Sequence, residues 1–250
     1  MNKLPAITLS FWIMKICATT LGETAGDLLS MTMNVGYAVS SAILLSVFFA
    51  TLVVQLTTKK FHPIIYWAVI LATSTAGTTM SDFMDRTLGL GYATGSLILV
   101  SLLIATLIIW KQKEKSLSVT NIKSTRGEIF YWTAILFSNT LGTALGDFLA
   151  DDSGLGFAGG AILIGSLLAV IVLLFYFTKV FHVVLFWLAF VLTRPFGATF
   201  GDLLTKTHEK GGLNFGTIGS SAILFTILVV LVVISIFKLN RETKHTQTII

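Results

Sequence analysis

Long apolar stretches alternate with short polar connections along the whole chain. Each stretch is close to the roughly 20 residues that an α-helix needs to cross a bilayer. Because lipid cannot satisfy exposed backbone groups, apolar runs of this length are expected to be helices. The pattern predicts eight membrane-spanning helices, at residues 5–29, 36–57, 61–84, 91–110, 127–150, 156–178, 180–205 and 215–237.

Every second apolar stretch contains a Trp that is followed by an Asp fifteen residues later. The four pairs are Trp12 and Asp27, Trp67 and Asp82, Trp132 and Asp147, and Trp187 and Asp202. A two-helix unit is therefore repeated four times, and since two spans return the chain to its starting side, all four units share one orientation. This predicts an all-α polytopic membrane protein of parallel repeats, pseudo-symmetric about the membrane normal, with the Asp-bearing helices lining the centre and the others packed outside.

The chain divides into two halves that align without a gap over most of their length. The first half, residues 1–110, and the second half, residues 127–238, each contain two repeats and four predicted helices. A basic linker, residues 111–126, joins the halves, and a polar tail follows at residues 239–250.

Composition and charge support a membrane protein and set its orientation. Hydrophobic residues make up 54% of the chain and charged residues 12%, against about 25% charged residues in soluble domains. Twelve basic residues flank the predicted spans on the side of the N-terminus, and only Arg86, Lys206 and Lys210 lie opposite. The positive-inside rule then places both termini in the cytoplasm. This bias also accounts for the net charge of +5, so the lipid bilayer is the expected partner and nucleic acid is not. The sequence leaves open whether the chain forms homo-oligomers.

The repeated Asp residues are the main functional candidates, because a carboxylate inside an apolar segment is costly and usually has a task. At about 100° of rotation per residue, the positions four and seven before each Asp share its face. Those positions carry an acid in the first repeat and hydroxyl groups in most others, namely Glu23, Thr78, Thr143, Thr20, Thr75 and Thr140. Each inner helix is therefore predicted to present one oxygen-rich face.

Small residues spaced by four form a separate stripe on the same helices. They are Gly22 and Gly26, Gly77 and Ser81, Gly142 and Gly146, and Gly197 and Gly201. Such pairs let membrane helices approach closely, so these positions are interpreted as packing contacts. The repeated Trp, near the cytoplasmic end of each span, is interpreted as an anchor or a packing residue.

Carboxylate and hydroxyl oxygens suit hard cations and protons rather than soft metals. Asp27, Asp82, Asp147 and Asp202 are the predicted coordinating or protonatable groups, and Glu23 with Asp27 forms the candidate metal pair, one helical turn apart. Arg194 and Lys15 are predicted to be their charge partners. No cofactor is expected.

The repeats resemble a known family. Four tandem two-helix units, each with a Trp and a Gly-x-x-x-Gly/Ser-Asp element, are similar to a bacterial inner-membrane family built from a repeat of unknown function; the resemblance covers residues 8–238 and implies no activity. A second resemblance is to Ca²⁺/Mn²⁺ exporters, which carry Glu-apolar-Gly-Asp in each half. Here one residue more separates Glu23 from Asp27, and the second half has Thr143 in place of Glu.

These features favour a transporter of a small hard cation, such as Mn²⁺ or Ca²⁺, or of a proton-coupled solute. The alternative is a structural or accessory membrane protein without transport. A remote alternative is an intramembrane aspartyl protease, since the segment before Asp147 resembles the Gly-x-Gly-Asp element of those enzymes. Ala144 replaces its first Gly and the Tyr-Asp partner motif is missing from the sequence, so we expect no enzyme.

Overall fold

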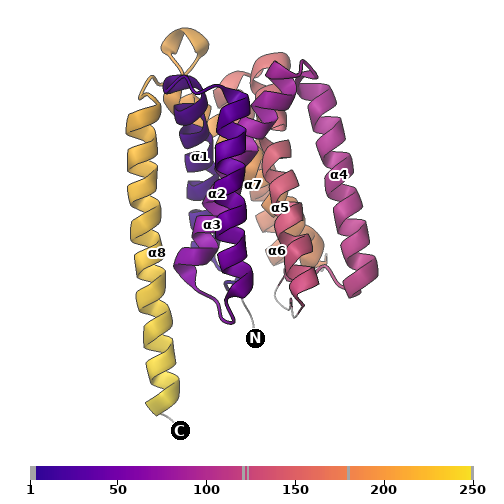
Figure 1. Ribbon diagram of the computed structural model, residues 1–250, viewed down its shortest axis with the longest axis vertical. Helices are drawn as coiled ribbons and strands as arrows, with labels where there is room; N and C mark the ends of the chain where they lie inside the picture. Colours follow the sequence, from indigo (N-terminus) through magenta and orange to yellow (C-terminus); the bar gives the residue numbers. More distant parts are fainter. Residues whose placement is uncertain (1–3, 120–121, 123, 179–180, 249–250) are drawn as a thin grey trace.

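The computed structural model describes residues 4–119, 122, 124–178 and 181–248, and these residues fold into helices without any strand (Figure 1). The long helices are α1 (Leu9–Asp27), α2 (Tyr37–Thr57), α3 (Pro63–Asp82), α4 (Gly91–Glu114), α5 (Thr125–Asp147), α6 (Gly156–Phe177), α7 (His182–Thr205) and α8 (Thr217–Thr248). Each predicted apolar stretch forms one helix. The main difference is α8, which continues through most of the polar tail.

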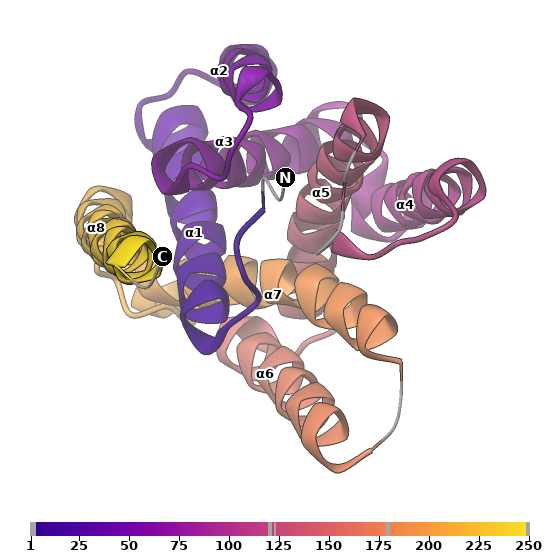
Figure 2. The same cartoon turned by 90° about the horizontal axis from the view of Figure 1, so that it is seen from below.

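The four odd-numbered helices form a ring around a central axis, which Figure 2 shows from below. In this ring α1 packs against α3, α3 against α5, α5 against α7, and α7 against α1. The even-numbered helices lie outside: α2 packs on α3, α4 on α5, α6 on α7, and α8 on α1. Each outer helix therefore covers the inner helix of the next repeat, and the last repeat closes on the first. Both ends of the chain lie at the same end of the bundle (Figure 1).

Inner and outer helices differ in what they expose. In α3, 72% of the apolar span is buried, whereas in α8 only 6% is. The outer helices present large apolar side chains to the surroundings, among them Val53, Ile104 and Leu173. Such surfaces are too extensive for a protein in water and suit contact with lipid.

Within the part of the chain that the structure describes, six helices are long and apolar enough to cross a membrane, namely α2, α3, α4, α6, α7 and α8. The prediction of eight spans is thus met in part, since α1 and α5 fall below this level. Both carry polar and charged side chains that face the other inner helices, such as the buried Lys15 and Asn139. A helix in the centre of a bundle does not need apolar residues on all its faces.

Short, similar turns connect inner to outer helices. After Asp27, Asp82 and Asp147 the helix widens into one π-helical turn of five residues. An Asn-x-Gly or Gly-x-Gly element follows, and both of its ends have positive φ, as in Asn34 (56°) and Gly36 (81°). Gly and Asn tolerate this left-handed conformation better than other residues. The fourth repeat lacks the π-turn but keeps the element, at Asn214 and Gly216.

Candidate functional site

The four repeated Asp residues lie at the ends of the inner helices farthest from the chain termini (Figure 1). All four are buried, with only 2–4% of each residue exposed. A carboxylate at this depth has to be paired, hydrogen-bonded or protonated. The partners of these carboxylates are therefore central to the site.

Two basic residues pair with all four Asp carboxylates. Lys206 Nζ lies 2.6 Å from an oxygen of Asp27 and 3.0 Å from one of Asp202. Arg86 Nε lies 3.0 Å from an oxygen of Asp82, and its Nη2 lies 3.1 Å from one of Asp147. Each basic group thus joins carboxylates from two neighbouring repeats. The contacts within one repeat, Arg86 with Asp82 and Lys206 with Asp202, are ion pairs without hydrogen-bond alignment.

Lys206 lies just beyond the end of α7. Burial by itself lowers the pKa of its ammonium group, but the carboxylates of Asp202 and Asp27 outweigh that effect and raise the pKa above its usual range. The two acids therefore favour the protonated form of Lys206, which lies between them.

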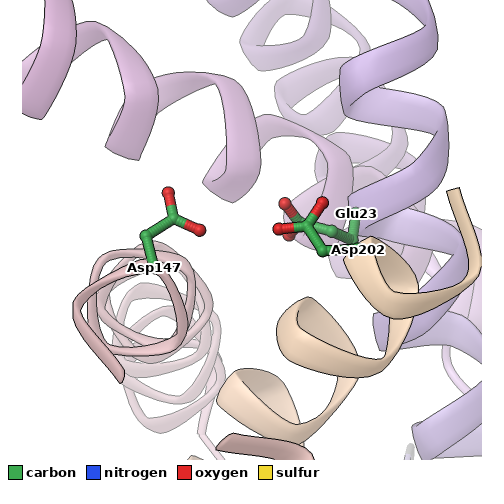
Figure 3. A group of neighbouring side chains, drawn as sticks. All are labelled: Glu23, Asp147 and Asp202. Atoms are coloured by element: carbon green, nitrogen blue, oxygen red, sulfur yellow. The ribbon is translucent and has the colours of Figure 1, made fainter. Parts of the chain in front are cut away.

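Glu23 joins the Asp residues at the axis. One carboxylate oxygen each of Glu23, Asp147 and Asp202 lie within 4.8 Å of one another, and all three residues are buried. Figure 3 shows Asp147 reaching from α5 toward Glu23 on α1 and Asp202 on α7. Three of the five acids of the ring thus form a group that a cation could bridge.

Each of these three acids uses only one oxygen for its contacts with described residues. In Glu23 all contacts reach Oε2, in Asp147 the ion pair reaches Oδ2, and in Asp202 it reaches Oδ1. The second oxygen of each carboxylate is left for another ligand.

Arg194 lies one level deeper and pairs with Glu23. Its Nη2 is 2.9 Å from Glu23 Oε2 and donates to Thr78 Oγ1 (2.5 Å) and Thr143 Oγ1 (2.7 Å). Neither partner of the ion pair is accessible, with 0% of Arg194 and 3% of Glu23 exposed. The predicted charge partner Arg194 therefore binds the acid that is unique to the first repeat, not one of the repeated Asp residues.

The prediction that Lys15 pairs with an acid is wrong. Its Nζ lies 3.4 Å from Asn139 Oδ1 and 3.9 Å from the centre of the Phe190 ring, and no acid contacts it among the described residues. The physical reason is distance along the helix, because twelve residues at 1.5 Å each put Lys15 about 18 Å from Asp27.

The predicted hydroxyl face is only partly correct. Thr78 and Thr143 both contact Glu23 and Arg194. The other three predicted hydroxyls donate only to carbonyls of their own helices, which are those of Ile16 for Thr20, Leu71 and Ala72 for Thr75, and Leu136 for Thr140. A Thr inside a helix readily makes this bond, which removes its hydroxyl from the site.

The small residues lie at contacts between neighbouring inner helices. A Cβ added at Gly22 would meet Ser74, and one at Gly142 would meet Arg194 and Pro195. The same holds for Gly26 against Thr78, Gly77 against Asn139, Gly146 against Ala198, Gly197 against Thr19 and Gly201 against Glu23. Ser81 is buried and donates to Asp85. These positions set the close spacing of the ring.

Aromatic residues close the opposite end of the ring. An aromatic residue precedes each repeated Trp and contacts the Trp of a neighbouring repeat, in the pairs Phe11–Trp67, Tyr66–Trp132, Tyr131–Trp187 and Phe186–Trp12. Tyr66 and Tyr131 also share a hydrogen bond of 2.7 Å between their hydroxyls. The repeated Trp is thus a packing residue of a closed aromatic ring.

Sequence reasoning missed the two basic residues that bridge the acids. Arg86 and Lys206 were assigned to external connections, yet both stand four residues after an Asp, one helical turn away. That spacing, repeated at the same place in both halves, was the available signal. The Phe or Tyr before each Trp was a second signal in the sequence, and it indicates the aromatic ring.

Comparison with known proteins gives one family. The model of a family described as Repeat of Unknown Function (DUF347) matches the chain four times, at residues 10–61, 65–116, 130–181 and 185–238. Each match contains one Trp-to-Asp segment and the outer helix after it, except that the fourth match ends within α8. No curated protein and no solved structure matches the chain.

Proposed function

Because the chain belongs to the DUF347 repeat family, whose description assigns no activity, we propose a function from the geometry of its own site. The protein is a membrane transporter, not an enzyme, and moves a small hard cation or a solute coupled to protons. Glu23, Asp147 and Asp202 are the cargo ligands. The remaining acids, Asp27 and Asp82, hold the basic residues that balance them.

The observation that carries this proposal is the convergence of three carboxylates from three different helices. Their nearest oxygens lie within 4.8 Å of one another. Hard cations such as Ca²⁺ take oxygen ligands at about 2.3–2.6 Å, so one ion between these oxygens needs only small side-chain movements. Packing alone would not require acids from α1, α5 and α7 to meet at one point.

The charge balance also favours a cation. Around the axis lie five acids, namely Glu23 and the four repeated Asp, and four basic residues, namely Lys15, Arg86, Arg194 and Lys206. With all of them ionised the ring has an excess of one negative charge. A proton or a monovalent cation neutralises that excess, whereas a divalent cation turns it into an excess of one positive charge.

The membrane setting is part of the proposal. All eight helices cross the bilayer, with α1 and α5 shielded by the others, and both termini lie in the cytoplasm of a bacterial cell. The acids then face the external side and the aromatic ring faces the cytoplasm. Cargo enters the site from the outside past Arg86 and Lys206.

The test is transport by the purified full-length protein in liposomes that contain a dye sensitive to divalent cations. Mn²⁺ or Ca²⁺ is added outside, with and without a pH gradient. We expect uptake above that of empty liposomes, and a loss of at least about tenfold in Asp147→Asn and Glu23→Gln, because each removes a charged ligand that water does not replace at this depth. The matched control is Asp152→Asn, which removes an exposed acid close to Asp147 and should retain the wild-type rate. Equal uptake in all variants would rule out these ligands.

One observation favours a second candidate, a structural or accessory membrane protein. All four repeated Asp residues already have basic partners that join neighbouring repeats. On this alternative, Asp147→Asn lowers the thermal stability of the protein, and neither the variant nor the wild type moves ions. Flux and unfolding temperature, measured on the same preparations, separate the two.

A further inference from the structure

Arg194 crosses the centre of the bundle and contacts the other three inner helices. From α7 its guanidinium reaches the carbonyl of Thr19 and the carboxylate of Glu23 on α1, Thr78 on α3, and Thr143 on α5. The side chain is completely buried. One cationic group therefore fills the axis directly below the carboxylates.

Arg194 occupies a position at which the other three repeats have shorter side chains. Eight residues before each Asp stand Thr19, Ser74, Asn139 and Arg194, and all four pack against a glycine of a neighbouring inner helix. Thr19 bonds to carbonyls of α1 and α7, and the Asn139 amide donates to Thr73 and Ser74 on α3. Arg194 alone reaches the other three inner helices at this level.

A second basic side chain lies below the first. Lys15 is also completely buried, between the level of Arg194 and the aromatic ring. Its contacts are Asn139 and Phe190, so no acid among the described residues neutralises it. Unscreened like charges repel strongly in a medium of low dielectric constant. A cation moving inward from the acids would meet the guanidinium of Arg194 and then the amino group of Lys15, and the charge of Arg194 opposes flow through an open channel.

The guanidinium of Arg194 is not locked into one set of bonds. Four acceptors lie within 3.4 Å of its Nη2, which has only two hydrogens to donate, and they are Glu23 Oε2, Thr78 Oγ1, Thr143 Oγ1 and the Ser74 carbonyl. Its Nε is buried and has no hydrogen-bond partner among the described residues. Different choices of acceptor let the group shift without losing all its bonds.

We propose that Arg194 is the central gate of the transport path, a tethered cation that holds Glu23 until cargo takes its place. The inference rests on the proposed function and adds the way in which the site is regulated. Cargo held by Glu23, Asp147 and Asp202 competes with the guanidinium for the same carboxylate. The path opens inward only when Arg194 moves, which makes the protein a carrier rather than a channel.

The experiment measures trans-stimulation, the acceleration of labelled uptake by unlabelled cargo inside. Liposomes with the full-length protein take up radioactive Ca²⁺ or Mn²⁺, with or without the same unlabelled ion inside. A carrier is accelerated several-fold, because its loaded site returns faster than its empty one, and an open channel is not. We expect trans-stimulation in the wild type and its disappearance in Arg194→Gln. Uptake into liposomes without the unlabelled ion inside should be faster in Arg194→Gln than in the wild type.

Three further variants complete the test. Ser74→Ala changes the equivalent position of the second repeat and should keep trans-stimulation, and Arg194→Lys, which retains the charge, should keep part of it. If Arg194→Gln fails to fold because Glu23 is left unpaired, the double variant Arg194→Gln/Glu23→Gln removes that charge and takes its place. Because Glu23 is itself a cargo ligand, the double variant is compared with Glu23→Gln alone, and it should show faster uptake than that variant, without trans-stimulation.

The outcomes separate the gate from the transport function. Wild-type uptake no greater than that of empty liposomes overturns the proposed function itself. Wild-type uptake without trans-stimulation, or Arg194→Gln that keeps it, overturns the gate and leaves transport standing. A double variant whose uptake is no faster than that of Glu23→Gln alone also overturns the gate, because removing a gate has to open the path.

Discussion

Arg86 and Lys206 occupy the same place in the two halves of the chain, and each holds together Asp carboxylates of two neighbouring repeats. Arg86 joins Asp82 to Asp147, and Lys206 joins Asp202 to Asp27. The four repeats share one arrangement of inner and outer helices, yet their bridging bases are arranged with twofold symmetry. The bases also lie across the two junctions where one half of the chain meets the other.

Removing Lys206 should destabilise the junction between the last and first repeats. We expect Lys206→Met to lower the free energy of unfolding by about 1–3 kcal/mol, less than for a fully buried pair because the ammonium is partly exposed. Its side chain is 18% exposed. The measurement is thermal unfolding in detergent. Lys210→Met removes an exposed lysine nearby and should have little effect; equal shifts in both variants would contradict the structural role of Lys206.

The glycine beside Arg194 should not tolerate a methyl group. In Gly142→Ala the new Cβ would overlap Arg194 and Pro195 on α7, and overpacking of a rigid contact typically costs about 1–3 kcal/mol. We expect a lower unfolding temperature and lower yield in the membrane. The matched control is Gly219→Ala on α8, where the Cβ meets open space and the higher helix propensity of Ala should leave stability unchanged or slightly higher.

The sequence was sufficient to predict the helices, the repeats and the separation of inner from outer helices. Apolar length defines a span, and the positions of Asp27 and its three equivalents along each unit show which helix carries the polar face. The circular closure, in which α8 covers α1, also agrees with parallel repeats. The packing of each outer helix on the inner helix of the next repeat was not predictable, because periodicity does not describe which helices contact each other.

The partners within the site could not be predicted from periodicity. A helical wheel places Thr20, Thr78 and Glu23 on comparable faces, but it does not tell whether a hydroxyl bonds to its own helix or across the axis. The wheel also ignores the position of a residue along the helix axis. For that reason it pairs Lys15 with an acid that lies about 18 Å away along the helix. Long side chains such as Arg194 reach across helices and depend on the ring as a whole.

The orientation of the repeats can be tested with single cysteines. In a Cys17→Ala background, Ser153→Cys lies in an exposed turn after α5, and Ser116→Cys lies in the exposed linker after α4. We expect a membrane-impermeant maleimide to label the first in intact cells and the second only after lysis. The opposite result would place the acids on the cytoplasmic side and reverse the direction in which cargo reaches them.

The hydroxyl pair at the closed end of the ring should act as one unit. Tyr66 and Tyr131 are buried and bond to each other at 2.7 Å, so Tyr66→Phe leaves the hydroxyl of Tyr131 without a partner in an apolar surrounding. That loss should cost about 1–2 kcal/mol of unfolding free energy. The variant Tyr66→Phe/Tyr131→Phe removes both hydroxyls and should cost less than the sum of the single variants, which a double-mutant cycle measures directly. Tyr176→Phe, on the exposed surface of α6, is the control for loss of a hydroxyl as such. Additive single effects would show that the two hydroxyls do not depend on each other, and the aromatic ring would then be held by its tilted and edge-to-face contacts alone.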